Sequence, residues 1–176
     1  MIRLADTPVL ETERLILRQL QPGDAQGLMA FLRSERATPL GGPMSEADAW
    51  ETAALVLGHW ALRGFGLWAV VPRGCAMTVG TAGCLWPARW PEGEIAWHLW
   101  TADAEGRGFA REAATAARAH AFCKLGWRSA VSYIAPENTR SIRLAERLGA
   151  ELDPGAAHPF GDAPMQVWRH IPGVAA

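Results

Sequence analysis

The segment that decides the fold is Glu94 to Arg111, EIAWHLWTADAEGRGFAR, in which a run typical of a strand leads through two glycines into a helix. Residues 94–100 are mostly apolar and aromatic, which favours a strand, and the Ala-rich run from Gly108 to Leu125 predicts a helix. Glycines let the backbone approach a ligand closely, and the free N–H groups of a helix's first turn favour an anion. A turn that merely begins a helix would show the same glycine spacing, so the spacing alone leaves both interpretations open.

On either side of this segment the chain alternates between helical and strand periodicity. We expect helices over residues 24–33, 45–63, 108–125 and 138–148. We expect strands over residues 15–20, 67–71, 78–86, 94–100, 129–134 and 165–170. Pro72-Arg73-Gly74 and the segment Pro87 to Gly93 predict antiparallel hairpins between the strands that they join. This order of elements predicts an α+β fold, with one mixed sheet and helices on its faces.

Short polar residues mark the expected ends of the helices. Asp24 is placed to cap the first helix, and Ser45 with Asp48 three residues later resembles a capping box at the second. Asn138 is expected to cap the last helix at its N-terminus, and Gly149 to end it.

Composition and length narrow the class of protein. The 176 residues suit a single domain over residues 1–176, and the formal net charge of -1 provides no basic field for nucleic acid. The most apolar stretch, Ala53 to Leu62, is too short to span a bilayer, and charges at Arg3 and Asp6 interrupt any signal-peptide core. We therefore expect a cytoplasmic protein that binds neither nucleic acid nor a membrane.

The three cysteines, Cys75, Cys84 and Cys123, are odd in number and follow no metal-ligand or CxxC spacing. This pattern predicts buried thiols in a reducing compartment, with no disulfide framework and no metal site. A thiol enzyme that uses Cys84 or Cys123 is one functional hypothesis, although neither residue lies in a recognisable nucleophile motif.

Two other phosphate-binding motifs fail when they are compared with the chain. A dinucleotide-binding fingerprint needs a third small residue where Arg111 stands and an acid about twenty residues further on, but no Asp or Glu occurs between Glu112 and Glu137. The chain also lacks the GxxxxGK[ST] run of a P-loop NTPase.

Three segments instead resemble one family. Residues 94–99 with 105–113 resemble the acetyl-coenzyme A (acetyl-CoA) motif of the GNAT superfamily of N-acetyltransferases, and more narrowly that of the ribosomal-protein alanine and serine N-acetyltransferases. Residues 138–150, NTRSIRLAERLGA, resemble the N-x-x-S-x-x-x-x-x-x-L-G-F signature of that branch. Residues 10–18, LETERLILR, resemble its usual first strand.

The resemblance implies a three-layer α/β/α arrangement: a mostly antiparallel sheet of six to seven strands, splayed after the fourth strand, with about four helices. It implies acetyl-CoA as cosubstrate and no metal. The cofactor contacts that it assigns are Leu99, Trp100, Thr101, Glu105, Gly106, Arg107, Gly108, Phe109, Ala110, Arg111, Asn138 and Arg143. One of these departs from the family pattern, because many members have glutamine or arginine where this chain has Glu105, and an acid beside a pyrophosphate is unfavourable.

The resemblance also implies direct attack of an amine on the thioester, with no acyl-enzyme. Glu94, at the position of the family's strand glutamate, and His98 on the same strand face are both candidates for the general base. Ser141 is the first candidate for the acid that returns a proton to the thiolate, with Tyr133 as a substitute. The tyrosine that many relatives use is replaced here by Ala145.

The acceptor is not defined by these motifs. We expect a primary amine, on a small molecule or on a peptide N-terminus, and the sequence leaves a homodimer open. A noncatalytic acyl-CoA-binding or regulatory module on the same fold is the alternative, which the missing tyrosine favours.

Overall fold

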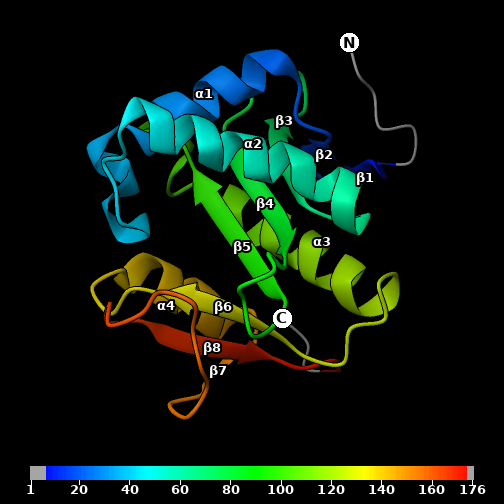
Figure 1. Cartoon of the computed structure of the whole chain (residues 1–176). Coiled ribbons are helices and arrows are strands. Elements are labelled where there is room, and N and C mark those ends of the chain that lie inside the picture. The colour runs from blue at the N-terminus through cyan, green and yellow to red at the C-terminus, as the bar shows by residue number, and fades with distance from the viewer. Residues whose placement is uncertain (1–6, 174–176) are drawn as a thin grey trace.

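The computed structural model describes residues 7–173, so Arg3 and Asp6 lie outside the described residues (Figure 1). Within this range, eight strands form one sheet in the order β1-β2-β3-β4-β5-β6-β8-β7. The strands are β1 Leu10–Glu11, β2 Leu15–Arg18, β3 Leu67–Pro72, β4 Gly80–Leu85, β5 Glu94–Leu99, β6 Ala130–Ile134, β7 Glu151–Leu152 and β8 Gln166–His170. All neighbouring pairs are antiparallel except β5 and β6. The expected six to seven strands were too few because β1 and β7, of two residues each, are too short to show a periodicity.

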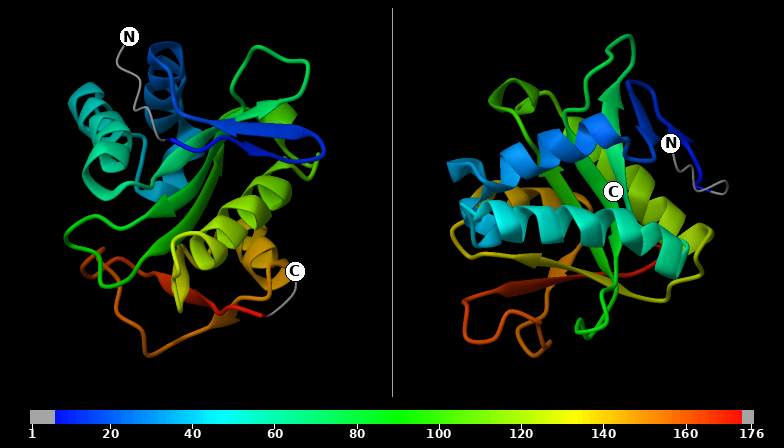
Figure 2. Two further views of the ribbon diagram at one scale, coloured as in Figure 1. Left: turned by 90° about the vertical axis from the view of Figure 1, so that its right-hand side faces the viewer. Right: turned by 45° about the horizontal axis from the view of Figure 1, so that its top comes forward.

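Helices cover both faces of the sheet, as expected (Figure 2). The α-helices of the described part are α1 Pro22–Leu32, α2 Glu46–Arg63, α3 Phe109–Cys123 and α4 Thr139–Arg147, and the short 3-10 helices are η1 Glu35–Leu40 and η2 Ala102–Ala104. Helices α1 and α2 lie on one face, and α3 lies on the other with α4 beside it. No helix among the described residues is both long and apolar enough to cross a membrane.

The helix caps follow the sequence with one correction. Ser45 Oγ accepts a hydrogen bond from the Asp48 N–H at 3.1 Å, so the predicted cap of α2 is confirmed. In α1 the N-cap is Gln21, not Asp24, because the helix begins at Pro22, two residues before that carboxylate. Asp24 instead accepts a hydrogen bond from the Gln21 N–H at 2.6 Å and pairs with Arg18. It therefore closes the first turn from inside the helix.

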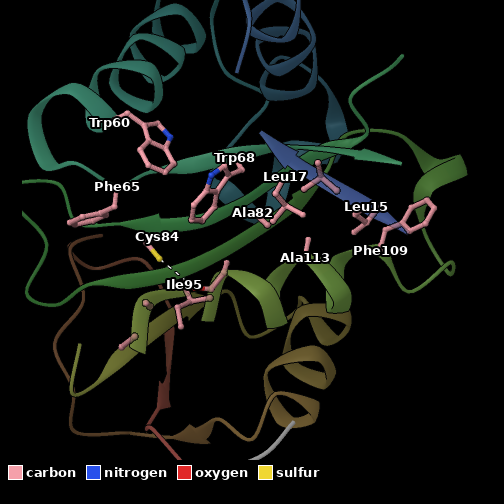
Figure 3. Packing of buried hydrophobic residues seen from close by; sticks show 14 of the residues in the cluster. Leu15, Leu17, Trp60, Phe65, Trp68, Ala82, Cys84, Ile95, Phe109 and Ala113 are labelled. Atoms are coloured by element: carbon pink, nitrogen blue, oxygen red, sulfur yellow. Dashed lines mark hydrogen bonds between the residues drawn. The ribbon is translucent and has the colours of Figure 1, made fainter. Parts of the chain in front are cut away.

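Alternate residues of the central strands pack into two separate cores. On β3, Leu67, Ala69 and Val71 belong to the core beneath α1 and α2, whereas Trp68 and Val70 belong to the core beneath α3. Figure 3 shows the core beneath α3, where the strands contribute large side chains and the helix contributes mainly alanines. Small helix residues let α3 lie close to the sheet, where it packs on β4 and β5.

The sheet opens between β5 and β6, as the resemblance implied. The two strands share a single ladder pair, Glu94 with Val131, and β4 pairs with β5 along all six residues. Beyond that pair, Ser132 Oγ donates a hydrogen bond to the Ile95 carbonyl at 2.5 Å. The edge of β5 that faces β6 is therefore released from the ladder after Ile95.

The cysteines are only partly as expected. Cys84 is fully buried, and burial raises its pKa to about 12, which makes it a poor nucleophile at neutral pH. Cys75 and Cys123 are exposed, so the expectation of buried thiols was wrong for both. Cys75 follows the turn after β3, and Cys123 is the last residue of α3, where the helix leaves the sheet.

Candidate active site

Glu94 lies at the point where β5 and β6 separate. The residue is 7% exposed, and its Oε1 accepts a hydrogen bond from the Tyr133 N–H at 3.3 Å. Burial raises the pKa of this carboxyl to about 8, and the single N–H bond only partly opposes that effect. A carboxyl with this pKa can exchange a proton near neutral pH.

His98 lies on the same face of β5 as Glu94, as strand alternation predicted. Ala96, between them on that face, and Trp100 both pack in the core beneath α1 and α2. The His98 ring lies 6.3 Å from that of Phe31, and its Nδ1 is 3.3 Å from Thr81 Oγ1. Burial lowers the pKa of His98 to about 4, so the imidazole is neutral at physiological pH.

Ser141 approaches the opening from the other face of the sheet. It lies in the first turn of α4, and its Oγ accepts a hydrogen bond from Trp97 Nε1 at 3.3 Å. Trp97 packs with the cores on the α3 and α4 side, opposite to Glu94. No hydrogen bond among the described residues joins Ser141 to Glu94 or to His98, so the structure brings the candidate base and acid to the same opening from opposite faces.

Three aromatic rings from separate segments pack together near Glu94, whose carboxyl oxygen accepts the Tyr133 N–H. The ring of Tyr133 lies 5.4 Å from that of Trp90 and 5.7 Å from that of Phe160, and these two lie 5.9 Å apart. Burial raises the pKa of the Tyr133 phenol to about 12, and the nearby Glu94 contributes to this shift. We call these three residues the aromatic trio.

Residues 105–111 form the turn before α3 and the first residues of that helix, and we call this segment the clasp. Gly106 and Gly108 have φ angles of +71° and +79°, a backbone conformation that favours glycine, and Gly108 is the N-cap of the helix. Within residues 7–173 the N–H groups of residues 108–111 have no hydrogen-bond acceptor, as expected for a helix's first turn. These groups can bind an anion.

The side chains of the clasp differ in what they can reach. Arg107 and Arg111 are exposed, and the Arg107 guanidinium lies 4.5 Å from the centre of the Phe109 ring. Phe109 itself is buried beside Leu15 (Figure 3), so only its backbone is available to a ligand. Ala110 packs against the cluster that joins α3 to α4.

Glu105, which departs from the family pattern, is held by two arginines. Its carboxylate forms ion pairs with Arg36 of η1 and with Arg140 at the start of α4. Arg36 also donates hydrogen bonds to the carbonyls of Trp100 at 3.0 Å and Leu99 at 3.3 Å. The negative charge of Glu105 is thus offset locally, which the sequence did not reveal because Arg36 lies 69 residues away, outside every recognised motif.

The expected pantetheine contacts are only partly free in the structure. The Trp100 N–H donates to the Val79 carbonyl at 2.9 Å, and Arg36 uses the Trp100 carbonyl, so the backbone of Trp100 is already paired on both sides. This pairing contradicts the expectation that Trp100 offers free backbone groups. Thr101 is exposed beyond the end of β5.

The start of α4 has the local structure that the sequence predicted. Asn138 Oδ1 accepts a hydrogen bond from the Ser141 N–H at 3.2 Å, so its predicted capping role is confirmed. Arg143 is exposed on α4. Ala145, where many relatives have tyrosine, is fully buried in a cluster with Ile134 and Trp168, with Trp97 packed against it.

Comparisons with known proteins agree with this geometry. Residues 14–151 match the family model described as an acetyltransferase (GNAT) domain. The crystal structure of an acetyltransferase from Agrobacterium tumefaciens has 35% sequence identity and a TM-score of 0.88, and the match covers 97% of this chain and 98% of that one.

Two more distant structures share the fold. A candidate ribosomal-protein-serine acetyltransferase from Vibrio cholerae has 19% identity and a TM-score of 0.72, over 96% of this chain and 100% of that one. RimL, a ribosomal-protein α-N-acetyltransferase solved in complex with coenzyme A, has 16% identity and a TM-score of 0.70, over 93% of this chain and 98% of that one. The match to the family model covers most of the chain, and the chain therefore belongs to the GNAT acetyltransferase family, as an acetyl-CoA-dependent N-acetyltransferase.

Proposed function

We propose that this protein transfers the acetyl group of acetyl-CoA directly to a primary amine, without an acyl-enzyme. The observation that carries the proposal is the arrangement at the opening of the sheet. A buried carboxyl with a pKa of about 8, Glu94, lies on one face, and a serine with a free hydroxyl hydrogen, Ser141, lies on the other. A noncatalytic binding module would have no need for a carboxyl tuned to exchange protons near neutral pH.

The clasp fits a pyrophosphate. The N–H groups of residues 108–111 supply donors, and exposed Arg107 and Arg111 supply positive charge. Arg36 and Arg140 outnumber the one carboxylate of Glu105, so an anion at the clasp meets a net positive surrounding. Asn138 and Arg143 at α4, with the open edge of β5 at Leu99 and Thr101, would hold the remainder of the cofactor. When bound, acetyl-CoA supplies an activated acyl group and a thiolate leaving group.

We assign the role of general base to Glu94. As a carboxylate it accepts a proton from the incoming ammonium, directly or through a water molecule. His98 is less suited to this role because its pKa of about 4 makes the neutral imidazole a weaker base than a carboxylate whose pKa is about 8. His98 and Thr81 then serve to fix the end of β5.

We assign Ser141 to the return of a proton to the thiolate, as a relay: its hydroxyl gives its hydrogen to the sulfur and takes a replacement proton from solvent. The indole N–H of Trp97 can only donate, so Ser141 Oγ accepts in that bond and keeps its own hydrogen for another partner. Tyr133 is a poorer candidate because its ring packs against Trp90 and Phe160, away from the face of the sheet on which Ser141 contacts Trp97. A thiolate needs little help to leave, so this contribution is expected to be smaller than that of Glu94.

We propose that the acceptor reaches Glu94 past the aromatic trio. An ammonium is attracted to aromatic faces, and a flanking apolar group can pack on the rim of Phe160, which is 40% exposed. Both a peptide N-terminus and a small amine fit this description. The distant structural relatives named for ribosomal proteins support the inclusion of peptides that begin with serine or alanine.

The test is the release of free thiol from acetyl-CoA by the purified protein with a panel of amines, including peptides with N-terminal Ser or Ala. We expect steady thiol release with at least one class of amine, and a matched mass increase of one acetyl group on that amine. Tight binding of acetyl-CoA without turnover across the panel would favour the noncatalytic module. Loss of turnover in Cys84→Ala or Cys123→Ala, with the fold retained, would favour the thiol enzyme.

A further inference from the structure

The turn between β1 and β2 lies against the clasp, although almost 100 residues separate the two in sequence. The Arg14 guanidinium donates a hydrogen bond from Nη1 to the Arg107 carbonyl at 2.8 Å. It also binds Glu112, in the first turn of α3, through Nε and Nη2, each at 2.7 Å from Oε2. The other oxygen of Glu112 accepts hydrogen bonds from Thr12 Oγ1 at 2.6 Å and from the Arg14 N–H at 2.8 Å.

Because a peptide bond is planar, the bond from Arg14 to the Arg107 carbonyl fixes the direction of the next N–H in the clasp, that of Gly108. In a trans peptide the C=O and the N–H of the next residue point in opposite directions. Because the Arg107 carbonyl points to Arg14, the N–H of Gly108 points away from Arg14, and it has no acceptor among the described residues. Gly108 is also the N-cap residue of α3.

The contact leaves little freedom at this peptide. A Cβ at position 108 would lie 3.1 Å from Arg14 Nη2 and crowd the guanidinium, and the φ of +79° at Gly108 is itself unfavourable for any other residue. Only 16% of the Glu112 side chain is exposed, and this burial acts to raise its pKa, but its bonds to Thr12 and Arg14 together keep the pKa below the usual range. The carboxylate therefore stays charged and holds Arg14 in place at neutral pH.

We propose that Arg14, held by Glu112, is a positioning residue that orients the Gly108 N–H toward the pyrophosphate of acetyl-CoA. Arg14 acts from behind the clasp, through the backbone, and does not itself touch the cofactor. Its charge is matched by Glu112, so the effect depends on hydrogen-bond direction more than on the electrostatic field. The inference rests on the proposed function, because it requires that the clasp bind the pyrophosphate.

The experiment compares two donors that differ in the 3′-phospho-ADP part of the cofactor. Acetyl-CoA carries this part, with its pyrophosphate, and S-acetyl-pantetheine lacks it, so the change that a clasp variant makes in the ratio of their KM values measures what the altered contact contributes to binding of this part. We expect Arg14→Ala to raise KM for acetyl-CoA about tenfold, equivalent to about 1.4 kcal/mol, and to leave KM for S-acetyl-pantetheine unchanged. Arg14→Lys should recover part of the loss, since one donor can still reach the carbonyl. Arg33→Ala, which removes an arginine of similar exposure paired with Glu46, should change neither value.

The outcomes distinguish a failure of the role proposed for Arg14 from a failure of the clasp as the pyrophosphate site. A wild-type protein that uses both donors with the same KM would overturn the clasp assignment and the inference together. A wild-type protein that prefers acetyl-CoA, with an Arg14→Ala variant that keeps the preference, would overturn the inference alone. An equal rise in the KM values for both donors would show that Arg14→Ala disturbs the whole site, and it would also count against the role proposed for Arg14. If Arg14→Ala does not fold, Glu112→Gln should reduce the same preference about threefold, and an unchanged preference would count against the inference.

Discussion

The cofactor side and the acceptor side that we propose for this protein meet at Glu94, but they are built differently. The cofactor side uses backbone groups of one strand–turn–helix segment, residues 94–113, with the start of α4 beside it. The acceptor side uses side chains from three separate segments, which contribute Trp90, Tyr133 and Phe160. Backbone geometry is set by local sequence, whereas a cluster of distant side chains can change one residue at a time. The donor can therefore be read from the motif, and the acceptor cannot.

Glu94→Gln should have the largest effect, because it acts where the two sides meet. We expect kcat to fall about 100-fold, the lower range for loss of a general base. In the wild type kcat/KM should rise with pH as the carboxylate forms near pH 8, and this inflection should disappear in the variant. KM values for both substrates should change little, and a rate above one-half of wild type would remove Glu94 from the mechanism.

Glu94→Gln also provides a check on the fold. A folded pKa of about 8, above the usual 4.5, means that the folded state binds the proton more tightly than the unfolded state. The stability that this gives is present below pH 4.5 and is lost as pH rises through about 8. The Tm of the variant should therefore rise relative to that of the wild type between pH 5 and pH 9.

Gly108→Val tests the cofactor side alone. The side chain would meet Arg14 and force an unfavourable φ, so KM for acetyl-CoA should rise at least tenfold while KM for the amine stays unchanged. Gly126→Val is the matched control, because Gly126 has a φ of +70° and no atom within 4 Å of an added Cβ. Gly126→Val strains the backbone outside the clasp, so it should leave KM for acetyl-CoA unchanged. An unchanged KM in Gly108→Val would refute the clasp.

Phe160→Ala tests the acceptor side alone. Loss of one ring from the aromatic trio should raise KM for the preferred amine about fivefold, or about 1 kcal/mol, with KM for acetyl-CoA unchanged. Ile171→Ala removes a similarly exposed apolar side chain elsewhere and should alter neither value. If Phe160→Ala instead raises KM for acetyl-CoA, the division between the two sides is wrong.

Glu105→Gln should have the smallest effect, because two arginines already offset this carboxylate. We expect KM for acetyl-CoA to fall about threefold, since the change removes a negative charge near the pyrophosphate and frees Arg36 and Arg140. Asp103→Asn, an exposed acid in the same loop, should lower KM less. A rise in KM would mean that Glu105 is needed to hold Arg36 against the end of β5.

Elements with a strong local signal were predicted well. The four α-helices and six longer strands lie within a few residues of their expected bounds, and the hairpins joining β3, β4 and β5 have the expected direction. Errors occurred where an element was too short to show a pattern, or where one residue type suits two positions in a helix. β1 and β7 are too brief to show alternation, and Asp24 suits both the N-cap position and the third residue of a helix.

The sequence by itself determined the strand, turn and helix of the clasp, because Gly108 and the Ala-rich run impose their conformation locally. It also determined the cap at Asn138 and the family. Only the tertiary structure decided how the acid at Glu105 is compensated, which depends on Arg36 and Arg140. It likewise decided the pKa of Glu94 and the support of the clasp by Arg14. Burial and contacts between segments far apart in the chain set these properties, and neither is written in local sequence.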